Sequence, residues 1–319
     1  MGYRRRVASG RTPVSNQWRS HRERGSIGLI RLIIWIALHA GRSVCRVLLV
    51  PICIYFFLAA PLSRRASHEF LSRALGRRAR WRDTFRHLIV FSTTLLDRIY
   101  LLHGRQREWA IDINNEAAFW NALSAGRGCL LFGSHLGSFE MLAIVGSAEK
   151  KLSVNMVMHV DDSARLGSLM LGKRSALPYK VIALGQPGAM LQVKECLDRG
   201  EVVGILADRV YGNEATQSLP FLGSAARFSL SPFRLARITG APVLSVFGLR
   251  HSDRHYEIGF EALADRVDDP GSKTALPPSS ATVNAVSLER CLAAYVESLE
   301  RQARRCPYNW FNFYDYWKS

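Results

Sequence analysis

A histidine and a glutamate stand five residues apart where the pattern of the chain changes. His135 follows an apolar, strand-like run (residues 128–134), and Glu140 lies near the start of an apolar, helix-like run (residues 139–148). A carboxylate can fix the tautomer of an imidazole while the other ring nitrogen removes a hydroxyl proton. Gly137 permits a bend between them, which predicts His135 in a loop and Glu140 in the first helical turn. The pair is a candidate general-base site; a capping histidine beside a solvated glutamate is the alternative.

Other chemistry is less well supported by the residue spacing. The same spacing recurs at His103 and Glu108, but no strand precedes it, so we interpret that segment as a solvated loop. Ser134 and Ser138 flank His135 and leave a Ser–His acyl-enzyme open, although Gly-x-Ser-x-Gly is absent. The six cysteines form no CxxC pair or zinc spacing, so no metal site or disulfide scaffold is expected.

The elements that must position these residues alternate along the chain. Apolar, β-rich runs cover residues 128–134, 153–160, 179–184, 201–207, 241–249 and 255–263. Helical patterns cover residues 116–124, 139–148, 187–199, 230–239 and 287–304. This alternation predicts an α/β fold with a mixed, mostly parallel sheet covered by helices. Ligands of such sheets bind beyond the carboxyl ends of the strands, so residues that follow strands are the first candidates.

Positive charge is concentrated in the first third of the chain. The protein has 43 basic and 26 acidic residues, a net charge of +17. Residues 1–110 carry a net charge of +16, and the remaining 209 residues carry +1. We predict a basic, disordered tail (residues 1–25), a membrane-anchoring helical region (residues 26–110) and an α/β domain (residues 111–319). The basic residues flank an apolar zone instead of alternating with exposed aromatic residues, which argues against nucleic-acid binding.

The apolar zone consists of two runs, residues 27–40 and 47–60, each 14 residues long. A helix of that length covers about 21 Å, whereas the hydrocarbon core of a bilayer is about 30 Å thick. Arginines on both sides of the zone favour an anchor retained at an anionic membrane surface. A cleaved signal peptide and buried core helices are the alternatives. Both a spanning and a single-leaflet anchor remain open.

Four ordered motifs connect the chain to a known family. GSHLGSFE (residues 133–140), LADRVYG (206–212), LPFLGSAAR (219–227) and FRLARITGAPVLSVF (233–247) occur in that order. Together they resemble the lipid A late acyltransferases, the lauroyl and myristoyl transferases of lipopolysaccharide assembly, within the glycerolipid acyltransferase superfamily. The resemblance runs from about residue 27 to the C-terminus.

The resemblance implies an activity, its partners and its site. An acyl group would move from a thioester on acyl carrier protein or CoA to a hydroxyl of a glycolipid, at the cytoplasmic face of the inner membrane. Acyl carrier protein, anionic lipid and the glycolipid acceptor would be the partners, and no cofactor would be needed. The family's boxes map onto the following residues: His135 and Glu140; Asp208 and Arg209; Phe221, Leu222, Gly223 and Ala226.

Three departures from the family pattern concern the acceptor. Family members often carry an arginine after the second strand of the core, and here His159 or Arg165 would have to substitute. The glutamine of the Asp-Gln box is Arg209. The ending PYNWFNFYDYW (residues 307–317) resembles superfamily members associated with aryl polyene or related lipid pathways. The acceptor could thus be a lipid A precursor, a related glycolipid or another lipid.

The hypothesis assigns a role to each candidate. His135 would take the hydroxyl proton, Glu140 would orient His135, and the backbone N–H groups near Gly137 and Ser138 would bind the developing oxyanion. Arg209 and Arg227 would bind phosphate or carboxylate on the acceptor, and Asp208 would shape this wall or contact acceptor hydroxyls. The rival hypotheses are a glycosyltransferase or hydrolase that uses Asp208, and a membrane scaffold with a degenerate site.

Overall fold

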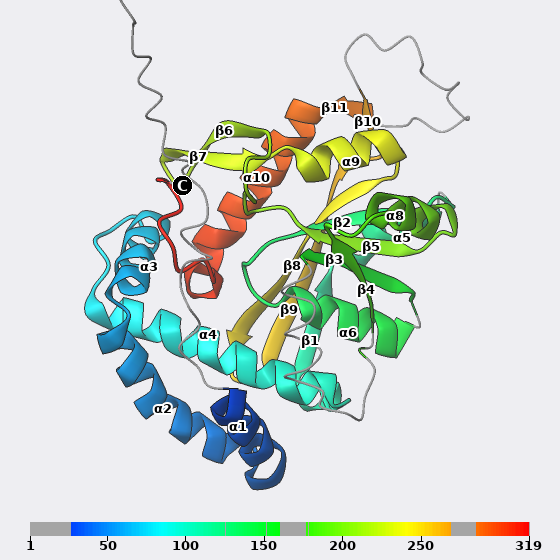
Figure 1. Cartoon of the computed structure of the whole chain (residues 1–319). Coiled ribbons are helices and arrows are strands. Elements are labelled where there is room, and N and C mark those ends of the chain that lie inside the picture. Colours follow the sequence, from blue (N-terminus) through cyan, green and yellow to red (C-terminus); the bar gives the residue numbers. More distant parts are fainter. Residues whose placement is uncertain are drawn as a thin grey trace, which may run out of the picture.

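The computed structural model describes residues 27–124, 126–150, 152–159, 177, 179–268 and 285–318 (Figure 1). The predicted basic tail, residues 1–25, lies outside the described residues. Four helices precede the first strand: α1 (Ile27–Ala40), α2 (Arg42–Ala59), α3 (Pro61–Ala74) and α4 (Trp81–Leu102). A short 3₁₀ turn (Gln106–Glu108) then leads into the sheet.

The two apolar runs form α1 and α2, which are separated by a single residue. Gly41 has a φ of +85° and breaks the helical path between them. Helix α2 begins five residues before the predicted apolar run, because the basic step before that run is itself helical. It is 18 residues long and, among the described residues, is the one helix long and apolar enough to cross a membrane.

The central sheet has seven strands in the order β1-β9-β8-β2-β5-β3-β4. Five of them run in one direction: β2 (Cys129–Gly133), β3 (Val154–His159), β4 (Lys180–Leu184), β5 (Val202–Leu206) and β8 (Val243–Ser252). Strand β9 (His255–Ala264) is antiparallel to β8, and β1 (Ala110–Asn114) is parallel to β9. The mixed, mostly parallel α/β sheet expected from the alternation of elements is confirmed.

Helices cover both faces of this sheet (Figure 1). The ranges of the remaining helices are α5 (Glu116–Ser124), α6 (Phe139–Lys150), α8 (Ala189–Asp198), α9 (Ser231–Thr239) and α10 (Leu288–Arg305). Every residue of β2 is buried, as expected for a parallel strand covered on both faces. Its alternate side chains enter two different cores: Leu130 and Phe132 face one, Cys129 and Leu131 the other.

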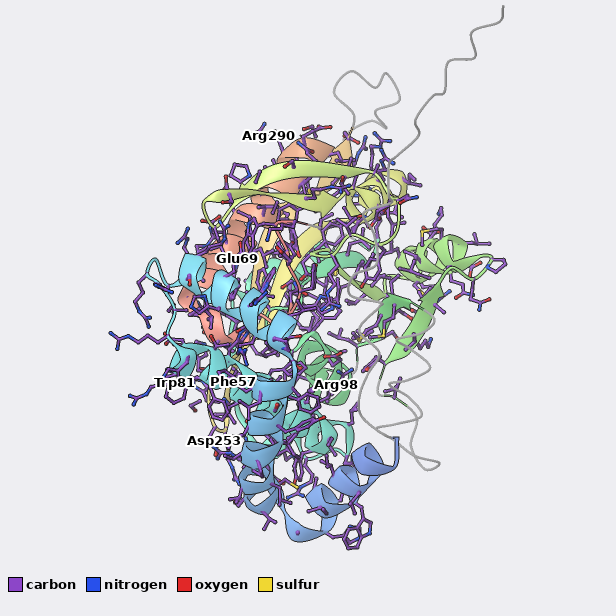
Figure 2. The ribbon with its side chains drawn as sticks, turned by 60° about the vertical axis from the view of Figure 1, so that its left-hand side comes forward. Phe57, Glu69, Trp81, Arg98, Asp253 and Arg290 are labelled. Atoms are coloured by element: carbon purple, nitrogen blue, oxygen red, sulfur yellow. The ribbon has the colours of Figure 1, made fainter. Side chains whose placement is uncertain are left out.

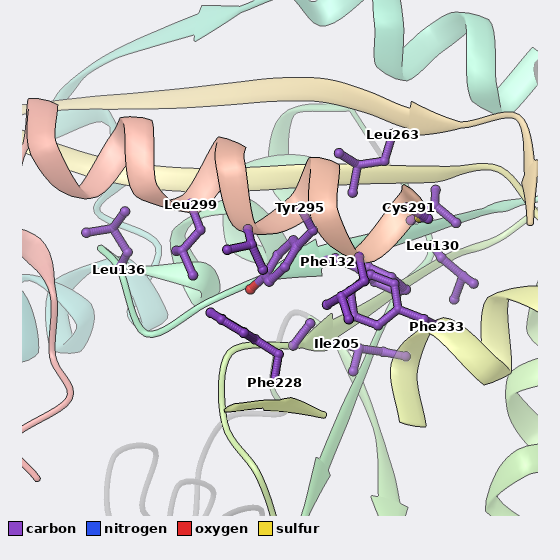
Figure 3. Packing of buried hydrophobic residues seen from close by; sticks show 14 of the residues in the cluster. Leu130, Phe132, Leu136, Ile205, Phe228, Phe233, Leu263, Cys291, Tyr295 and Leu299 are labelled. Atoms are coloured by element: carbon purple, nitrogen blue, oxygen red, sulfur yellow. The ribbon is translucent and has the colours of Figure 1, made fainter. Parts of the chain in front are cut away.

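The first core lies against α8, α9 and α10. Figure 3 shows Phe132 and Phe233 packed beside Tyr295 of α10, with Ile205 of β5 below them. The ring centroids of Phe132 and Phe233 are 5.0 Å apart in an edge-to-face arrangement, which aromatic pairs favour. The second core joins α4, α5 and α6 to the opposite face.

Two small strand pairs complete the fold. Strands β6 (Thr216–Phe221) and β7 (Ser224–Ser229) form an antiparallel hairpin, which the sequence analysis did not predict. Strands β10 (Arg266–Asp268) and β11 (Ala285–Ser287) pair in parallel. After α10, a 3₁₀ turn (Pro307–Asn309) leads into a C-terminal segment, residues 306–318, that returns to the carboxyl end of β2.

Candidate active site

The sheet order brings two of the predicted residues together. Strands β2 and β5 are parallel neighbours, with Gly133 opposite Leu206. The N–H of Ala207 donates to the carbonyl of Gly133 at 3.0 Å, so both strands end at the same level. His135 and Asp208 therefore leave the sheet side by side, at the edge where α/β proteins bind ligands.

Asp208 holds His135 with both carboxylate oxygens. The Nδ1 atom of His135 lies 2.9 Å from Oδ1 of Asp208, and the backbone N–H of His135 donates to Oδ2 at 3.0 Å. An ionised carboxylate can only accept hydrogen bonds, so the imidazole carries its proton on Nδ1 and leaves the Nε2 lone pair to accept a proton. Asp208 is fully buried, whereas the His135 side chain is about 20% exposed.

The electrostatics keep this histidine neutral and its partner charged. Burial lowers the pKa of His135, and the nearby positive charge of Arg209 lowers it further. Burial opposes the ionisation of Asp208, but the electrostatic interaction and hydrogen bonds with His135, together with the positive charge of Arg209, outweigh it, and the pKa of Asp208 is lowered. A neutral imidazole beside an ionised carboxylate is the arrangement that a general base requires near neutral pH.

The loop after His135 depends on two glycines in contact. Gly137 has a φ of +84°, and a Cβ atom there would lie 2.1 Å from the carbonyl oxygen of Gly248. A Cβ atom at Gly248 would lie 2.4 Å from the carbonyl oxygen of Ser138. No side chain fits at either position without moving backbone, so this close approach of the loop to β8 requires glycine at both.

The backbone N–H groups of Gly137 and Ser138, the expected oxyanion site, have partners within the protein. The N–H of Gly137 donates to the carbonyl of Asn309 at 2.7 Å, and the N–H of Ser138 donates to the carbonyl of Gly248 at 2.8 Å. A backbone N–H has one proton to donate. In the structure both N–H groups therefore stabilise the loop, and the binding of an oxyanion by backbone N–H groups near Gly137 and Ser138 stays a prediction.

Glu140 lies in the first turn of α6, as predicted, but its ion pair is with another residue. Its Oε1 atom lies 2.6 Å from a terminal guanidinium nitrogen of Arg98, on α4. The charge of Glu140 is near enough to raise the pKa of His135, a smaller effect than those that lower it. Glu140 was expected to orient His135, but in the structure the carboxylate bonded to Nδ1 of His135 is that of Asp208.

Close packing places the start of α6 against the sheet. The ring of Phe139 lies over Gly133 of β2 and Gly204 of β5, where added Cβ atoms would come within 2.3 and 2.6 Å of it. Two glycines on neighbouring strands thus make the hollow that receives this ring. Because Glu140 follows directly, the hollow also sets the distance of its carboxylate from the sheet.

The C-terminal segment forms one wall of the site. The N–H of Phe311 donates to the carbonyl of His135 at 2.7 Å, and the hydroxyl of Tyr316 donates to the backbone carbonyl of Asp208 at 2.6 Å. The side-chain amide of Asn312 donates to Oδ2 of Asp208 at 2.9 Å. The buried carboxylate of Asp208 thus accepts three hydrogen bonds, two from His135 and one from Asn312.

The site combines a neutral histidine, bonded to a buried carboxylate, with an ordered set of motifs, and a comparison with protein families assigns the chain to a family. A model of the bacterial lipid A biosynthesis acyltransferases matches residues 82–319, well over half of the chain. The chain belongs to this family. A search of curated proteins finds no significant match. The family assignment makes the protein an acyltransferase that acts on a lipid A-type acceptor, and members of the family are typically associated with the inner membrane.

In this member of the lipid A acyltransferase family, Arg209 contacts the C-terminal segment. Its Nε donates to the side-chain oxygen of Asn312 at 2.7 Å, and its guanidinium carbon lies 5.7 Å from the ring centroid of Tyr314. These contacts give Arg209 a role in fixing Asn312, which in turn contacts Asp208. The expectation that Arg209 also binds acidic groups of the acceptor stays a prediction.

The remaining candidates lie elsewhere or outside the described side chains. Gly223, with a φ of +81°, forms the turn of the β6–β7 hairpin. Arg227 is exposed on β7 and donates to the hydroxyl of Thr216 on the opposite strand. His159 ends β3, but its side chain is not among those described, and Arg165 lies outside the described residues.

Within the described ranges, no three His, Cys, Asp or Glu side chains are grouped as a metal site would require. Sequence reasoning missed two residues of this site, Asn312 and Arg98, and the direct contact of Asp208 with His135. Asp208 had a signal, because it follows a parallel strand just as His135 does. Asn312 had a weaker signal, as a polar residue within the aromatic C-terminal motif, and Arg98 had no signal in the sequence.

Proposed function

We propose that the protein transfers a fatty acyl group from an acyl carrier protein or CoA thioester to a hydroxyl of a lipid A precursor or related glycolipid, with His135 as the general base and Asp208 as the carboxylate that orients it. The observation that carries this proposal is the hydrogen bond of 2.9 Å between Nδ1 of His135 and Oδ1 of Asp208. It directs Nε2 to the proton that must be removed. The family supplies the reaction class.

The chemistry balances with one base. The hydroxyl oxygen of the acceptor attacks the carbonyl carbon of the thioester while Nε2 of His135 accepts the hydroxyl proton. The tetrahedral intermediate collapses, the C–S bond breaks, and His135 gives its proton to the departing thiolate. Asp208 stays ionised throughout and stabilises the imidazolium. General-base catalysis of this kind is worth about 10²–10⁴-fold in rate, or roughly 3–5 kcal/mol.

Glu140 has a different role in this proposal from the one that the sequence predicted. Its negative charge favours the imidazolium that forms when the proton moves, and Arg98 fixes the position of that charge at 2.6 Å. Glu140 thus supports His135 electrostatically, while Asp208 sets the tautomer. Both carboxylates contribute, through different contacts.

A product-based experiment tests the reaction class. The protein, solubilised in detergent, would be given a radiolabelled acyl carrier protein and a lipid A precursor, and the product analysed by mass spectrometry. We expect the acceptor to gain one acyl group, and His135→Ala to abolish the gain while the protein stays folded. A folded wild-type protein that transfers no acyl group, or a His135→Ala variant of near wild-type rate, would refute the proposal. Gain of a sugar would favour the glycosyltransferase alternative.

The acceptor has a second candidate. The C-terminal segment, which resembles that of aryl-polyene-associated acyltransferases, forms the wall beside Asp208 through Asn312 and Tyr316. We therefore also propose a non-lipid-A lipid hydroxyl as an alternative acceptor for the same chemistry. Mass spectrometry of lipids from cells with and without the protein would distinguish the two, because the mass difference reveals both the acyl group and the acceptor.

The proposal places the reaction at the cytoplasmic face of the inner membrane. Acyl carrier proteins and anionic lipids are its expected partners, and the exposed arginines at the turn between α3 and α4 supply positive charge for both. Attraction of this kind weakens as salt is added, so association with either partner should fall at high ionic strength.

A further inference from the structure

Helices α1 and α2 turn a broad apolar surface to the outside. On α2 the exposed fraction reaches 71% at Val47 and 68% at Leu58. We define the α1–α2 apolar face by its exposed residues: Leu32, Trp35, Val44, Val47, Leu48, Val50, Ile54, Tyr55, Phe56 and Leu58. A continuous apolar surface of this kind on two adjoining helices is characteristic of an interaction site, whereas isolated exposed apolar residues are ordinary.

The opposite face of α2 is bound to α4 along its length. At one end, Nε of Arg42 lies 2.7 Å from Oδ1 of Asp97. In the middle, the thiol of Cys53 contacts the hydroxyl of Ser92 at 3.3 Å. At the other end, the rings of Phe57 and Phe85 are 5.7 Å apart, so the two helices run antiparallel in continuous contact. Figure 2 shows α2 in the foreground, with Phe57 and Asp253 labelled toward its two ends.

Helix α4 in turn is bound to the α/β domain that carries the candidate active site. The hydroxyl of Tyr256 on β9 donates to Asp97 at 3.0 Å, and Arg98 makes the ion pair with Glu140. If α2 crossed a bilayer, α4 would enter the hydrocarbon with it, together with Arg98 and the start of α6. Charged groups at that depth cost several kcal/mol each. The packing of α2 thus disfavours a spanning position, although its length of 18 residues would permit one.

Positive charge and an interfacial aromatic residue stand beside the apolar face. Trp81, at the start of α4, is 63% exposed, and the guanidinium of Arg82 lies 5.4 Å from its ring centroid. Arg65, Arg80 and Arg86 are exposed nearby in the chain. Tryptophan and arginine are the residues that settle at the headgroup level of anionic membranes.

We propose that the α1–α2 apolar face lies in one leaflet of an anionic bilayer, with α2 parallel to the membrane plane, and does not span it. This rests on the membrane association in the proposed function and specifies its geometry. Interfacial helices reach about 5–10 Å into the boundary between headgroups and acyl chains. Helix α4 then lies between the embedded helix α2 and helix α6, which follows the loop of His135, since α4 contacts both.

The position of the two ends of α2 tests this geometry. Ser43, in the first turn of α2, and Arg65, on α3 beyond the other end of α2, are both exposed. Each would be replaced by cysteine in a Cys306→Ser background, because the other five cysteines are buried. The full chain would be added to preformed, sealed vesicles of phosphatidylcholine and phosphatidylglycerol and treated outside with a membrane-impermeant maleimide. We expect both sites to react equally; reaction of only one until the vesicles are opened would overturn the proposal.

Vesicle binding tests the surface itself. Val47→Asp should reduce co-sedimentation with these vesicles by about tenfold or more, because a carboxylate enters the buried face. Ile238→Asp is the matched control: Ile238 is 76% exposed but lies on α9, so binding should not change. Equal binding of both variants would overturn the proposal. So would a dimer in detergent that Val47→Asp dissociates without a loss of vesicle binding, since the face would then belong to a second copy.

Activity separates this inference from the proposed function. Val47 is far from the catalytic contacts, so Val47→Asp should keep wild-type acyl transfer to a detergent-dispersed acceptor. If the wild-type protein binds vesicles as expected but transfers no acyl group in detergent, the proposed function fails and the leaflet geometry stands. If the protein transfers acyl groups but its two cysteines are labelled from opposite sides of the vesicle membrane, the leaflet geometry fails and the proposed function stands.

Discussion

Replacing Asp208 by asparagine changes one oxygen to an NH₂ group and decides which carboxylate sets the tautomer of His135. In the structure Oδ1 accepts from Nδ1 of His135, and Oδ2 accepts from the His135 N–H and from Asn312. With the new NH₂ at the Oδ2 position, it would face two donors, and each buried group left unsatisfied costs about 1–3 kcal/mol. Asparagine should therefore place its NH₂ toward Nδ1.

In that orientation the amide donates to Nδ1 and the imidazole proton moves to Nε2. The atom that must accept the hydroxyl proton then carries one already. In the serine-protease triad the same carboxylate-to-amide change lowers kcat by about 10⁴-fold for this reason. We expect Asp208→Asn to lower kcat by about 10³–10⁴-fold, roughly 4–5.5 kcal/mol, with little change in KM.

The assay measures the transfer of a radiolabelled acyl group from acyl carrier protein under single-turnover conditions, and circular dichroism establishes that each variant is folded. Glu140→Gln is the matched control, because it makes the same chemical change without touching Nδ1. It should lower kcat by only about 10–100-fold, since it removes a charge near the imidazolium but leaves the proton of His135 on Nδ1. If Glu140→Gln proved the more damaging of the two folded variants, our assignment of the orienting carboxylate would be refuted.

Four further outcomes follow from the structure. The rate should fall as the pH drops through the pKa of His135, which burial lowers from the usual 6.5, so the midpoint of the acid limb of the pH profile should lie below that value. Burial lowers the pKa of His87 to about 4. On acidification the histidine of the unfolded chain is therefore protonated before that of the folded protein. The free energy of unfolding should fall by up to about 3 kcal/mol as the pH falls from 6.5 to 4. Thermal melts should show a weaker pH dependence of stability in His87→Gln. Asn312→Ala should lower kcat by about tenfold while Asn312→Asp, which sets two carboxylates face to face, should raise the apparent pKa in the pH profile. Gly248→Ala should destabilise the protein strongly in urea titrations, unlike Gly212→Ala, where the added Cβ meets no neighbour but a φ of +61° leaves a modest strain.

Much of the fold could be predicted because its elements carry local patterns. The helix of residues 116–124 was predicted to the residue, and the strand of residues 201–207 within one residue at each end. The β6–β7 hairpin was missed, since its exposed residues follow no clear alternation and Pro220 lies within it. Its turn, Leu222 and Gly223, was interpreted as part of a substrate-binding box.

The candidate site could be predicted only in part, because its contacts depend on strand order. His135 and Asp208 were both expected at strand ends, and their residue types were sufficient for that. Which strands are neighbours is determined by crossovers between elements distant in the chain, and local spacing carries no record of them. The spacing of five residues drew attention to Glu140, whereas the carboxylate that accepts the hydrogen bond of Nδ1 lies 73 positions away, at Asp208.

The contacts among His135, Asp208 and Asn312 have a consequence for how the enzyme is made. Their sequence separations are 73 and 104 residues, so the sheet and the C-terminal segment must both be in place before the imidazole is oriented. Contacts between distant parts of a chain form slowly, because closing a long loop has an entropic cost. In refolding from denaturant, helical and strand content should therefore return before catalysis does. Helix α2, which packs on its near neighbour α4 through the side opposite the α1–α2 apolar face, can form earlier. In the proposed geometry the chain can therefore reach the membrane before it is able to react there.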